Sequence, residues 1–344
     1  MNTVERIDEI LADPAITGGG EAIGESREGR LIHAFRFGEG DARVSLLAGC
    51  HADEPVGPRL LRRLCAFLSS LPSSDPLLKL YEWWIVPHIN PDGERRNRAW
   101  QQGEPEAYDL TAYLMNAVRE LPGDDIEFGF PRDAGDRKAR PENRSVWEWW
   151  ESAPGPFRLH VSLHGMAFAA GPWFLIEPAW RDRSRHLQER CVSKVKELGY
   201  TLHDVERRGE KGFFRLARGF STRPDSRYMR EHFEALGDHS TAQLFRPSSM
   251  EAVRALGGEP LTLVAEMPLF ITPGVGDDLG PPDPVAEKWR QRLEAWRLEL
   301  EKTGGTERLR RESTSAGLCA MPVRDQLILQ WTFVVAGLEQ AESG

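Results

Sequence analysis

Three side chains in this sequence have the types and the placement needed for metal-dependent hydrolysis. His51 and Glu54 lie three residues apart in LLAGCHADE, after an apolar run, and His164 ends a second apolar run. Two imidazoles and one carboxylate hold many hydrolytic zinc ions, which keep a fourth position for water. Zinc lowers the pKa of that water to about 7 and polarises a carbonyl oxygen. A single HxxE is more often a polar turn before a helix, with Glu54 as a cap, so the downstream residues matter.

A fourth ionisable group, Glu266, ends the apolar run LTLVAE. A carboxylate without a task would be costly to bury there. We expect Glu266 to remain unligated, to take a proton from the water and to pass it to the leaving nitrogen. The site of an open α/β sheet lies outside the carboxyl ends of its strands. The sequence therefore predicts one zinc ion per chain, held by His51, Glu54 and His164, with Glu266 as general base and acid.

Alternating strand and helix patterns surround these residues. Strands are predicted over residues 31–37 and 43–48, a helix over 58–71, and an aromatic strand over 81–89 that runs into the turn Asn-Pro-Asp-Gly. This order is typical of a parallel βαβ unit. Further strands are predicted over residues 157–163, 172–176 and 261–265, and helices over 4–12, 142–151, 181–198, 248–256, 285–302 and 324–340. Residues 110–121 form an amphipathic segment within a stretch that has no clear pattern.

Length and composition indicate an ordinary globular enzyme. The 344 residues carry a formal net charge of −9, which argues against general nucleic-acid binding. The four cysteines show no CxxC spacing, and no apolar run reaches the length of about 18 residues that a membrane span needs. No signal peptide is visible, so we expect a cytoplasmic protein. We expect an N-terminal helix and loop over residues 1–30, a catalytic domain over 31–281, and C-terminal helices over 282–344 packed on the same domain.

The motifs HADE, NPDG, SLHG and LVAEMP follow one another, with 113 residues from His51 to His164 and 102 from His164 to Glu266. In order and spacing they resemble the zinc carboxypeptidases, the M14 metallopeptidases, over about residues 31–270. The resemblance implies an α/β fold, a mostly parallel, mixed eight-stranded sheet with helices on both faces. It also implies His51, Glu54 and His164 as zinc ligands and Glu266 as general base and acid.

Members of this family also use an arginine that stabilises the oxyanion, and an Asn-Arg pair that binds the substrate's terminal carboxylate. In NPDGERRNRAW, one register gives the first role to Arg95 or Arg96 and the second to Asn97 and Arg98. We favour this register because a forked guanidinium suits a carboxylate. Arg95 then stands where the family has the aspartate that orients a zinc-bound histidine. A second register places the family's Asp-Leu-Asn-Arg on residues 109–112, Asp-Leu-Thr-Ala, and leaves no such pair.

Other residues have both a structural and a functional interpretation. The resemblance does not place the family's tyrosine near the substrate, and Tyr228 is a weak candidate for it. We expect His160 and His88 to be structural histidines of the core, the alternative being contact with the site. Four arginines are expected to be solvated surface, or else a rim that attracts acidic substrates: Arg207, Arg208, Arg215 and Arg218.

We predict a zinc-dependent hydrolase of peptide or amide bonds, foremost a metallocarboxypeptidase whose substrate is a peptide or small amide with a free carboxylate. An alternative in the same fold is a deacylase of the aspartoacylase and succinylglutamate desuccinylase kind, which acts on N-acyl amino acids. A third is an inactive binding protein, which would have no need of all four site residues. Neither a nucleic acid nor a membrane is an expected partner, and the oligomeric state stays open.

Overall fold

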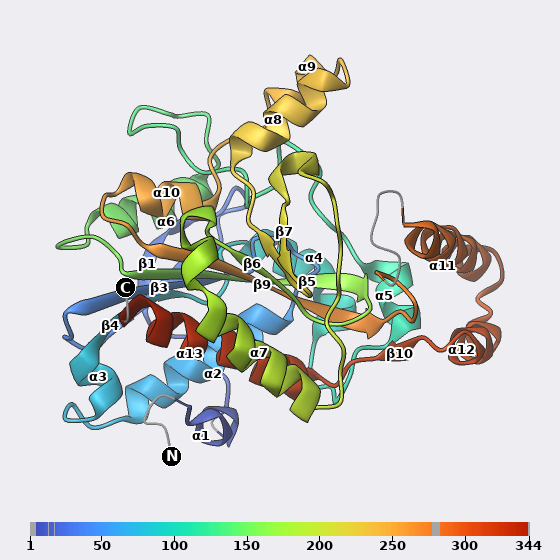
Figure 1. Ribbon diagram of the computed structural model, residues 1–344, viewed down its shortest axis with the longest axis horizontal. Coiled ribbons are helices and arrows are strands. Elements are labelled where there is room, and N and C mark those ends of the chain that lie inside the picture. The colour runs from blue at the N-terminus through green and yellow to red at the C-terminus, as the bar shows by residue number, and fades with distance from the viewer. Residues whose placement is uncertain (1–4, 13, 17, 277–282, 343–344) are drawn as a thin grey trace.

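The computed structural model describes residues 5–12, 14–16, 18–276 and 283–342 (Figure 1). The strands are β1 (Glu21–Glu25), β2 (Leu31–Phe37), β3 (Ala42–Ala48), β4 (Tyr81–Val86), β5 (Leu159–Ala169), β6 (Trp173–Ile176), β7 (Arg215–Ala217), β8 (Phe220–Thr222), β9 (Leu261–Ile271) and β10 (Cys319–Ala320). Within these residues they form one ten-stranded sheet in the order β1-β2-β4-β3-β5-β9-β6-β8-β7, and β10 pairs with β9.

The helices are α1 (Ile7–Ala12), α2 (Val56–Ser70), α3 (Pro76–Leu80), α4 (Pro91–Gln101), α5 (Leu110–Asn116), α6 (Pro141–Glu151), α7 (Arg185–Glu197), α8 (Ser226–Ala235), α9 (His239–Ala242), α10 (Ser249–Ala255), α11 (Pro284–Thr303), α12 (Thr306–Ser315) and α13 (Val323–Glu342), with 3-10 helices η1 (Pro178–Arg183) and η2 (Glu210–Gly212). On one face of the sheet, α2 and α13 pack against its strands, and α7 packs on α13 (Figure 1). On the other face, α6 packs against β1 and α10 against β5.

The centre of the sheet is parallel and its flanks are mixed. The four central strands β4, β3, β5 and β9 run parallel to one another. On either side of them, β2 joins β4 and β6 joins β9 in antiparallel pairs. The predicted α/β class with helices on both faces is confirmed. The described residues form ten strands rather than the eight that the resemblance implied, and three of the ten, β7, β8 and β10, have only two or three residues each. Such segments are too short to show the alternation by which a strand is recognised.

The two central strands β5 and β9 continue past the residues at which the sequence suggested an end. They stay paired in register from Leu159 with Leu261 to Ala169 with Ile271, so His164 and Glu266 lie within strands rather than at strand ends. By contrast β3 does end at Ala48, directly before the turn that carries His51. His51 and Glu54 therefore lie where β3 stops and its longer neighbour β5 runs on.

Alternation along the strands explains the two-sided core. Val44, Leu46 and Ala48 belong to one hydrophobic cluster with α2 and α13, whereas Leu47 belongs to a second cluster with residues of α6 and α10. Strand β1 begins inside the segment 1–30 that was expected to be helix and loop. The division of the chain near residues 30 and 281 stays a prediction.

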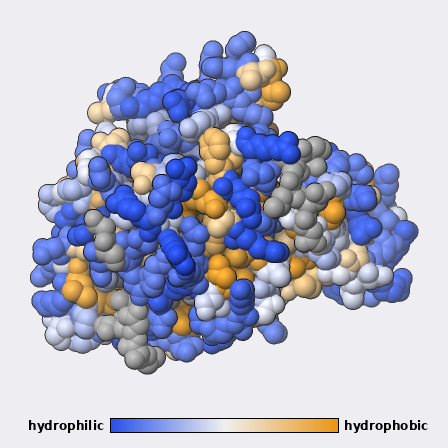
Figure 2. Space-filling model, viewed as in Figure 1, coloured by the Kyte–Doolittle hydropathy of each residue, from blue (hydrophilic) through white to orange (hydrophobic). Residues whose placement is uncertain are grey.

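Surface composition agrees with the charged sequence. The face shown in Figure 2 is largely hydrophilic, with hydrophobic side chains gathered toward its middle. Among the described helices, none has the length and apolar character that crossing a bilayer would require.

Candidate metal centre

The turn after β3 brings His51 and Glu54 together. Gly49 opens it with a φ of +75°, and an added Cβ would lie 2.4 Å from Nδ1 of His88, so a side chain is excluded there. The backbone N–H of Glu54 donates to the carbonyl of His51 over 3.3 Å. As a result, Nδ1 of His51 lies 2.7 Å from Oε1 of Glu54.

Strand β5 supplies the third group. Nδ1 of His164 lies 2.9 Å from Oε2 of Glu54 and 3.2 Å from Nδ1 of His51. All three potential ligand atoms lie within 4.8 Å of one another, and Glu54 and His164 are buried. The structure thus brings together the three residues that the sequence predicted as ligands.

The outer nitrogen of each imidazole faces a carboxylate. Nε2 of His51 lies 3.3 Å from Oδ1 of Asp125, and Nε2 of His164 lies 3.2 Å from Oε2 of Glu127. A proton on each Nε2 satisfies these carboxylates and leaves the Nδ1 lone pairs directed at a common point. Two neutral imidazoles and one carboxylate, all with such partners, fit the donor set of a catalytic zinc ion.

Electrostatics at this point favour a cation. Burial and the charge of Arg119 lower the pKa of His51, but Glu54 and Asp125 outweigh them and raise it to about 10. Burial alone would raise the pKa of Glu54, yet His51, Arg119 and His164 hold it well below its ordinary value. The same arrangement of carboxylates would stabilise a bound metal ion.

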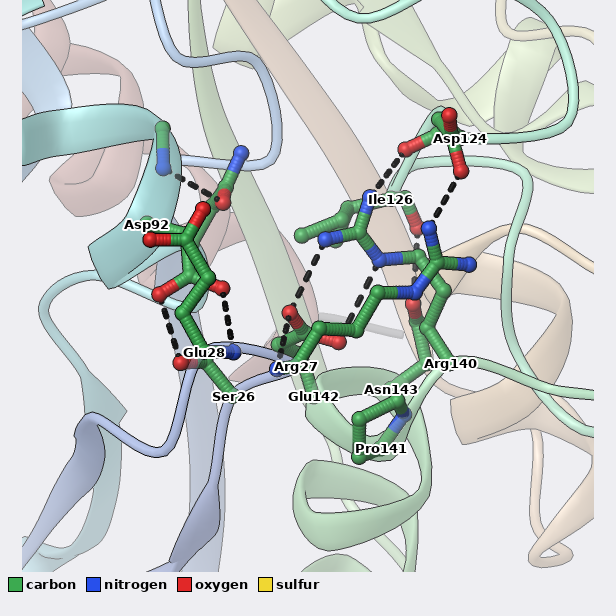
Figure 3. A network of polar contacts seen from close by, with 12 residues as sticks. Ser26, Arg27, Glu28, Asp92, Asp124, Ile126, Arg140, Pro141, Glu142 and Asn143 are labelled. Atoms are coloured by element: carbon green, nitrogen blue, oxygen red, sulfur yellow. Dashed lines mark hydrogen bonds and ion pairs between the residues drawn. The ribbon is translucent and has the colours of Figure 1, made fainter. Parts of the chain in front are cut away.

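Asp125 and Glu127 belong to a loop between α5 and α6 that has little periodicity in sequence. A polar network fixes this loop (Figure 3). Nη1 of Arg140 donates to the carbonyl of Asp124 over 2.5 Å, and Nδ2 of Asn143 donates to the carbonyl of Ile126 over 2.7 Å. The carbonyls on either side of Asp125 are therefore both held by side chains at the start of α6.

The same network reaches the turn between β1 and β2. The buried carboxylate of Glu142 receives two bonds from Arg140, of 2.9 and 3.2 Å, and one from the backbone N–H of Arg27. The Arg27 side chain in turn pairs with Asp124 (Figure 3). Segments that are distant in sequence thereby set the position of the two carboxylates behind the histidines.

Arg119 also enters the site, and the sequence did not single it out. Its guanidinium lies 3.0 Å from Oε1 of Glu54 and 3.3 Å from Oδ1 of Asp53, while part of the side chain stays exposed to solvent. The hydroxyl of Tyr113 on α5 donates to the same Asp53 over 3.3 Å. A cation next to the ligand cluster and open to solvent can meet negative charge on a substrate.

Glu266 lies across the sheet from His164. The two residues are paired in register on the parallel strands β5 and β9, so their side chains project from the same face. Burial, together with the charge of Glu54, raises the pKa of Glu266 to about 7, although His164, His51 and Arg119 act in the opposite direction. A carboxyl group with this pKa can both accept and return a proton near neutral pH.

The arginines predicted after the NPDG motif do not reach this site. The motif starts helix α4, with Asn90 as its cap, and Arg95, Arg96 and Arg98 are exposed on that helix. Arg96 forms an ion pair of 2.7 Å with Glu28. Within the part of the chain that the structure describes, no contact joins these three arginines to the ligand cluster, so the structure does not bring them to the site and their catalytic and binding roles stay predictions.

Asn97 is buried and its amide is fully used. Nδ2 donates to the carbonyls of Gly93 and Val118, over 3.1 and 2.8 Å. Oδ1 accepts from the backbone N–H of Val118 and from the indole of Trp100, over 2.9 and 2.8 Å. No donor remains for a substrate carboxylate, so this half of the predicted clamp is structural.

The structure does not bring the residues of the second register to the ligand cluster either. Asp109 caps α5 by accepting from the backbone N–H of Ala112 over 2.8 Å. The acid that the first register lacked is instead Asp125, which contacts His51 from a segment that neither register considered. The signal that could have located it is weak: two aspartates before an aromatic Gly-Phe-Pro loop.

His160 and His88 lie in the core, and Tyr228 lies on a helix. His160 is buried and bonds to Ser45 and Ser249, and burial lowers its pKa to about 3. His88 is buried as well, accepts from the backbone N–H of Asn90, and has a pKa lowered to about 4 by burial. Tyr228 lies on α8 and packs against Phe214. In this structure, both histidines have the structural role that we expected.

Residues 19–173 match the model of the zinc carboxypeptidase family, Peptidase_M14. Carboxypeptidase SOL1 of Arabidopsis thaliana is 30% identical over 143 residues, which make up 39% of this chain and 25% of that protein. The chain therefore matches about a quarter of the length of this relative.

Solved structures overlay on most of the chain. A candidate metallopeptidase from Shewanella amazonensis SB2B has a TM-score of 0.50 at 12% identity, over 93% of this chain and 86% of its own. Carboxypeptidase A of Helicoverpa armigera has a TM-score of 0.49 at 12% identity, over 99% of this chain and 72% of its own. The family match confirms the resemblance to the zinc carboxypeptidases over residues 19–173, and the chain shares the α/β fold of the Shewanella amazonensis structure.

Proposed function

We propose that the protein is a zinc-dependent hydrolase of peptide or amide bonds, with one zinc ion held by His51, Glu54 and His164. The observation that carries this proposal is the convergence of two Nδ1 atoms and one carboxylate, each supported from behind or beside by a further polar group. Membership of the matched residues in a zinc carboxypeptidase family supports the same conclusion.

The chain's own residues divide the remaining work. Bound zinc supplies a Lewis acid that polarises the substrate carbonyl and acidifies a water. Glu266 takes the proton of that water and passes it to the leaving nitrogen, for which a pKa of about 7 is suited. Arg119 donates to the oxygen on which negative charge develops. The sequence suggested Arg95 or Arg96 for this stabilisation of the oxyanion.

Carboxypeptidase activity is our first choice within this class, because of the family match. The structure also favours a second candidate, an amidase whose substrate has no free carboxylate. Asn97 has no free donor and Arg98 is exposed on α4, so the expected grip on a terminal carboxylate is missing. An amidase whose substrate has no free carboxylate needs no such pair, whereas a deacylase that acts on N-acyl amino acids would still meet a free carboxylate beside the scissile bond.

The test separates metal binding from proton transfer. Zinc-loaded wild-type protein should carry about one zinc per chain, and a chelator should abolish hydrolysis that zinc restores. His164→Ala should lose the metal. Glu266→Gln should keep it, while turnover falls by about 100-fold or more. Glu259→Gln, an exposed glutamate at the start of the same segment, is the matched control.

Two results would contradict the proposal. Protein that binds no zinc after loading would remove the metal centre. Near-normal turnover of Glu266→Gln, or loss of zinc from that variant, would show that Glu266 is not an unligated base.

A further inference from the structure

A row of side chains runs across the sheet beside the metal centre. His164 on β5 pairs with Glu266 on β9, and Glu266 pairs with Trp173 on β6. Residues that are directly paired on neighbouring strands project from the same face of a sheet. The indole of Trp173 therefore adjoins the proposed base on the side away from His164.

Arg207 lies on this indole. Its guanidinium carbon is 5.6 Å from the centre of the Trp173 ring and 4.6 Å from the centre of the Phe213 ring. The two rings are themselves 5.3 Å apart. Contacts of a guanidinium with aromatic faces hold its plane in place and leave its N–H edge free to donate.

A tight turn fixes Arg207 relative to Phe213. The backbone N–H of Glu210 donates to the carbonyl of Arg207 over 2.8 Å, and that of Gly209 donates to the carbonyl of Phe213 over 3.0 Å. Gly209 has a φ of +81°, and an added Cβ would lie 2.6 Å from the ring of Phe214. A turn closed in this way presents the arginine in a defined position rather than on a loose loop.

Arg207 differs from Arg215 and Arg223, two arginines of the neighbourhood that each bind a carboxylate. Arg215 binds Asp204 over 2.9 Å, and Arg223 binds Glu177 over 2.7 Å. Among the described residues, no carboxylate lies within ion-pair distance of Arg207, which is half-buried. Burial lowers its pKa, and the negative charges of Glu210 and Glu266 partly offset this effect. A partly desolvated guanidinium without a partner is suited to an anion from outside the chain.

We propose that Arg207 binds a carboxylate of the substrate on the side of Glu266 away from His164. This inference rests on the proposed function, because it places the scissile bond at the metal centre. Met166, Val205 and Phe213 pack against the hydrophobic cluster that contains Trp173, so the carboxylate is joined to an apolar portion of the substrate. The carboxylate comes either from the free end of a peptide or from an acidic side chain.

The experiment compares three peptides with wild-type protein and Arg207→Gln. One ends in a free phenylalanine, the second is the same peptide amidated, and the third is amidated with glutamate in place of phenylalanine. Loss of a charge-assisted contact should lower kcat/KM by about 10-fold or more on whichever anionic peptide uses Arg207, and by about twofold or less on the neutral one. Arg208→Gln, the exposed neighbour, should behave as wild type on all three.

Binding provides a second readout that does not need turnover. Calorimetry uses three ligands: N-acetylphenylalanine, N-acetylglutamic acid α-amide, whose one carboxylate is on the side chain, and N-acetylphenylalanine amide. Binding should show a preference for one of the acids over the neutral amide, which Arg207→Gln removes and Arg207→Lys keeps in part. Zinc content and thermal unfolding must match wild type in each variant. Binding of the acid through Arg207 without hydrolysis would support the inference while the proposed function fails.

Equal losses on charged and neutral peptides would overturn the inference, because Arg207 would then act only through the fold. An unchanged preference in Arg207→Gln, by kinetics or by calorimetry, would overturn it as well. Hydrolysis that persists with either result would leave the proposed function standing.

Discussion

The aspartate behind His51 provides a direct test of how the metal centre is assembled. Asp125→Asn is nearly isosteric and removes the negative charge that lies 3.3 Å from Nε2 of His51. Burial would raise the pKa of this carboxyl group, but His51 keeps it below its ordinary value, so the carboxylate is charged at neutral pH. In the variant, the imidazole loses the charge that keeps its proton on Nε2 and its lone pair on Nδ1.

The expected magnitude follows from the position of this group. Removal of a carboxylate that supports a metal-binding histidine weakens metal affinity by about 10- to 100-fold, which corresponds to about 1.4–2.7 kcal/mol. Asp124→Asn is the matched control, because its side chain points to Arg27 and the pair is exposed to solvent. An exposed ion pair contributes about 0–1 kcal/mol to stability and does not touch the histidine.

Zinc affinity is measured by competition with a chromogenic chelator at fixed neutral pH. Thermal unfolding of the metal-free proteins shows whether either variant has lost its fold. Wild-type affinity in Asp125→Asn would refute the assigned support of His51. Equal losses in Asp124→Asn and Asp125→Asn would show that the loop's position matters rather than the carboxylate.

Two further predictions concern residues outside the ligand cluster. Asn97→Ala should lower the free energy of unfolding in urea by about 2–3 kcal/mol, because four buried hydrogen bonds lose a partner, whereas Arg98→Ala should leave kcat/KM within about twofold of wild type. A selective loss of activity on free-ended peptides in Arg98→Ala would support the carboxylate clamp that the sequence predicted at Asn97 and Arg98. Stability should also fall as the pH drops below about 6.5, since unfolded histidines then bind protons that His88 and His160, with pKa values lowered to about 4 and about 3, do not bind in the fold. Each histidine lowers the free energy of unfolding by up to about 1.4 kcal/mol per pH unit until its folded pKa is reached. The free energy is measured by urea unfolding at several pH values, and a pH dependence that is unchanged in His88→Gln would contradict this assignment.

The sequence alone determined the parts of this protein that depend on short-range pattern. Apolar runs located the central strands, and the turn after the first of them placed His51 and Glu54 together. The order and spacing of four short motifs then indicated the family and the fold. These features survive in one dimension because a strand, a tight turn and a following helix are each encoded by neighbouring residues.

The helical structure of the segment NPDGERRNRAW determines which of its side chains are buried and which are exposed. The sequence suggested a turn followed by substrate-binding residues, but Pro91 begins an eleven-residue helix. In that helix Asn97 faces the core, while Arg95, Arg96 and Arg98 face solvent. Side chains in a helix repeat every 3.6 residues, so consecutive residues cannot all face one site.

Only the tertiary structure revealed the groups that complete the site. Asp125, Glu127 and Arg119 come from a segment with little periodicity, and its position is set by contacts with residues as distant as Arg27 and Arg140. The position of Arg207 near the site likewise follows from its contact with Trp173 and from the strand register that sets Trp173 beside Glu266. Such loops are positioned by hydrogen bonds and ion pairs between segments far apart in the chain, which no local pattern of hydrophobic residues records.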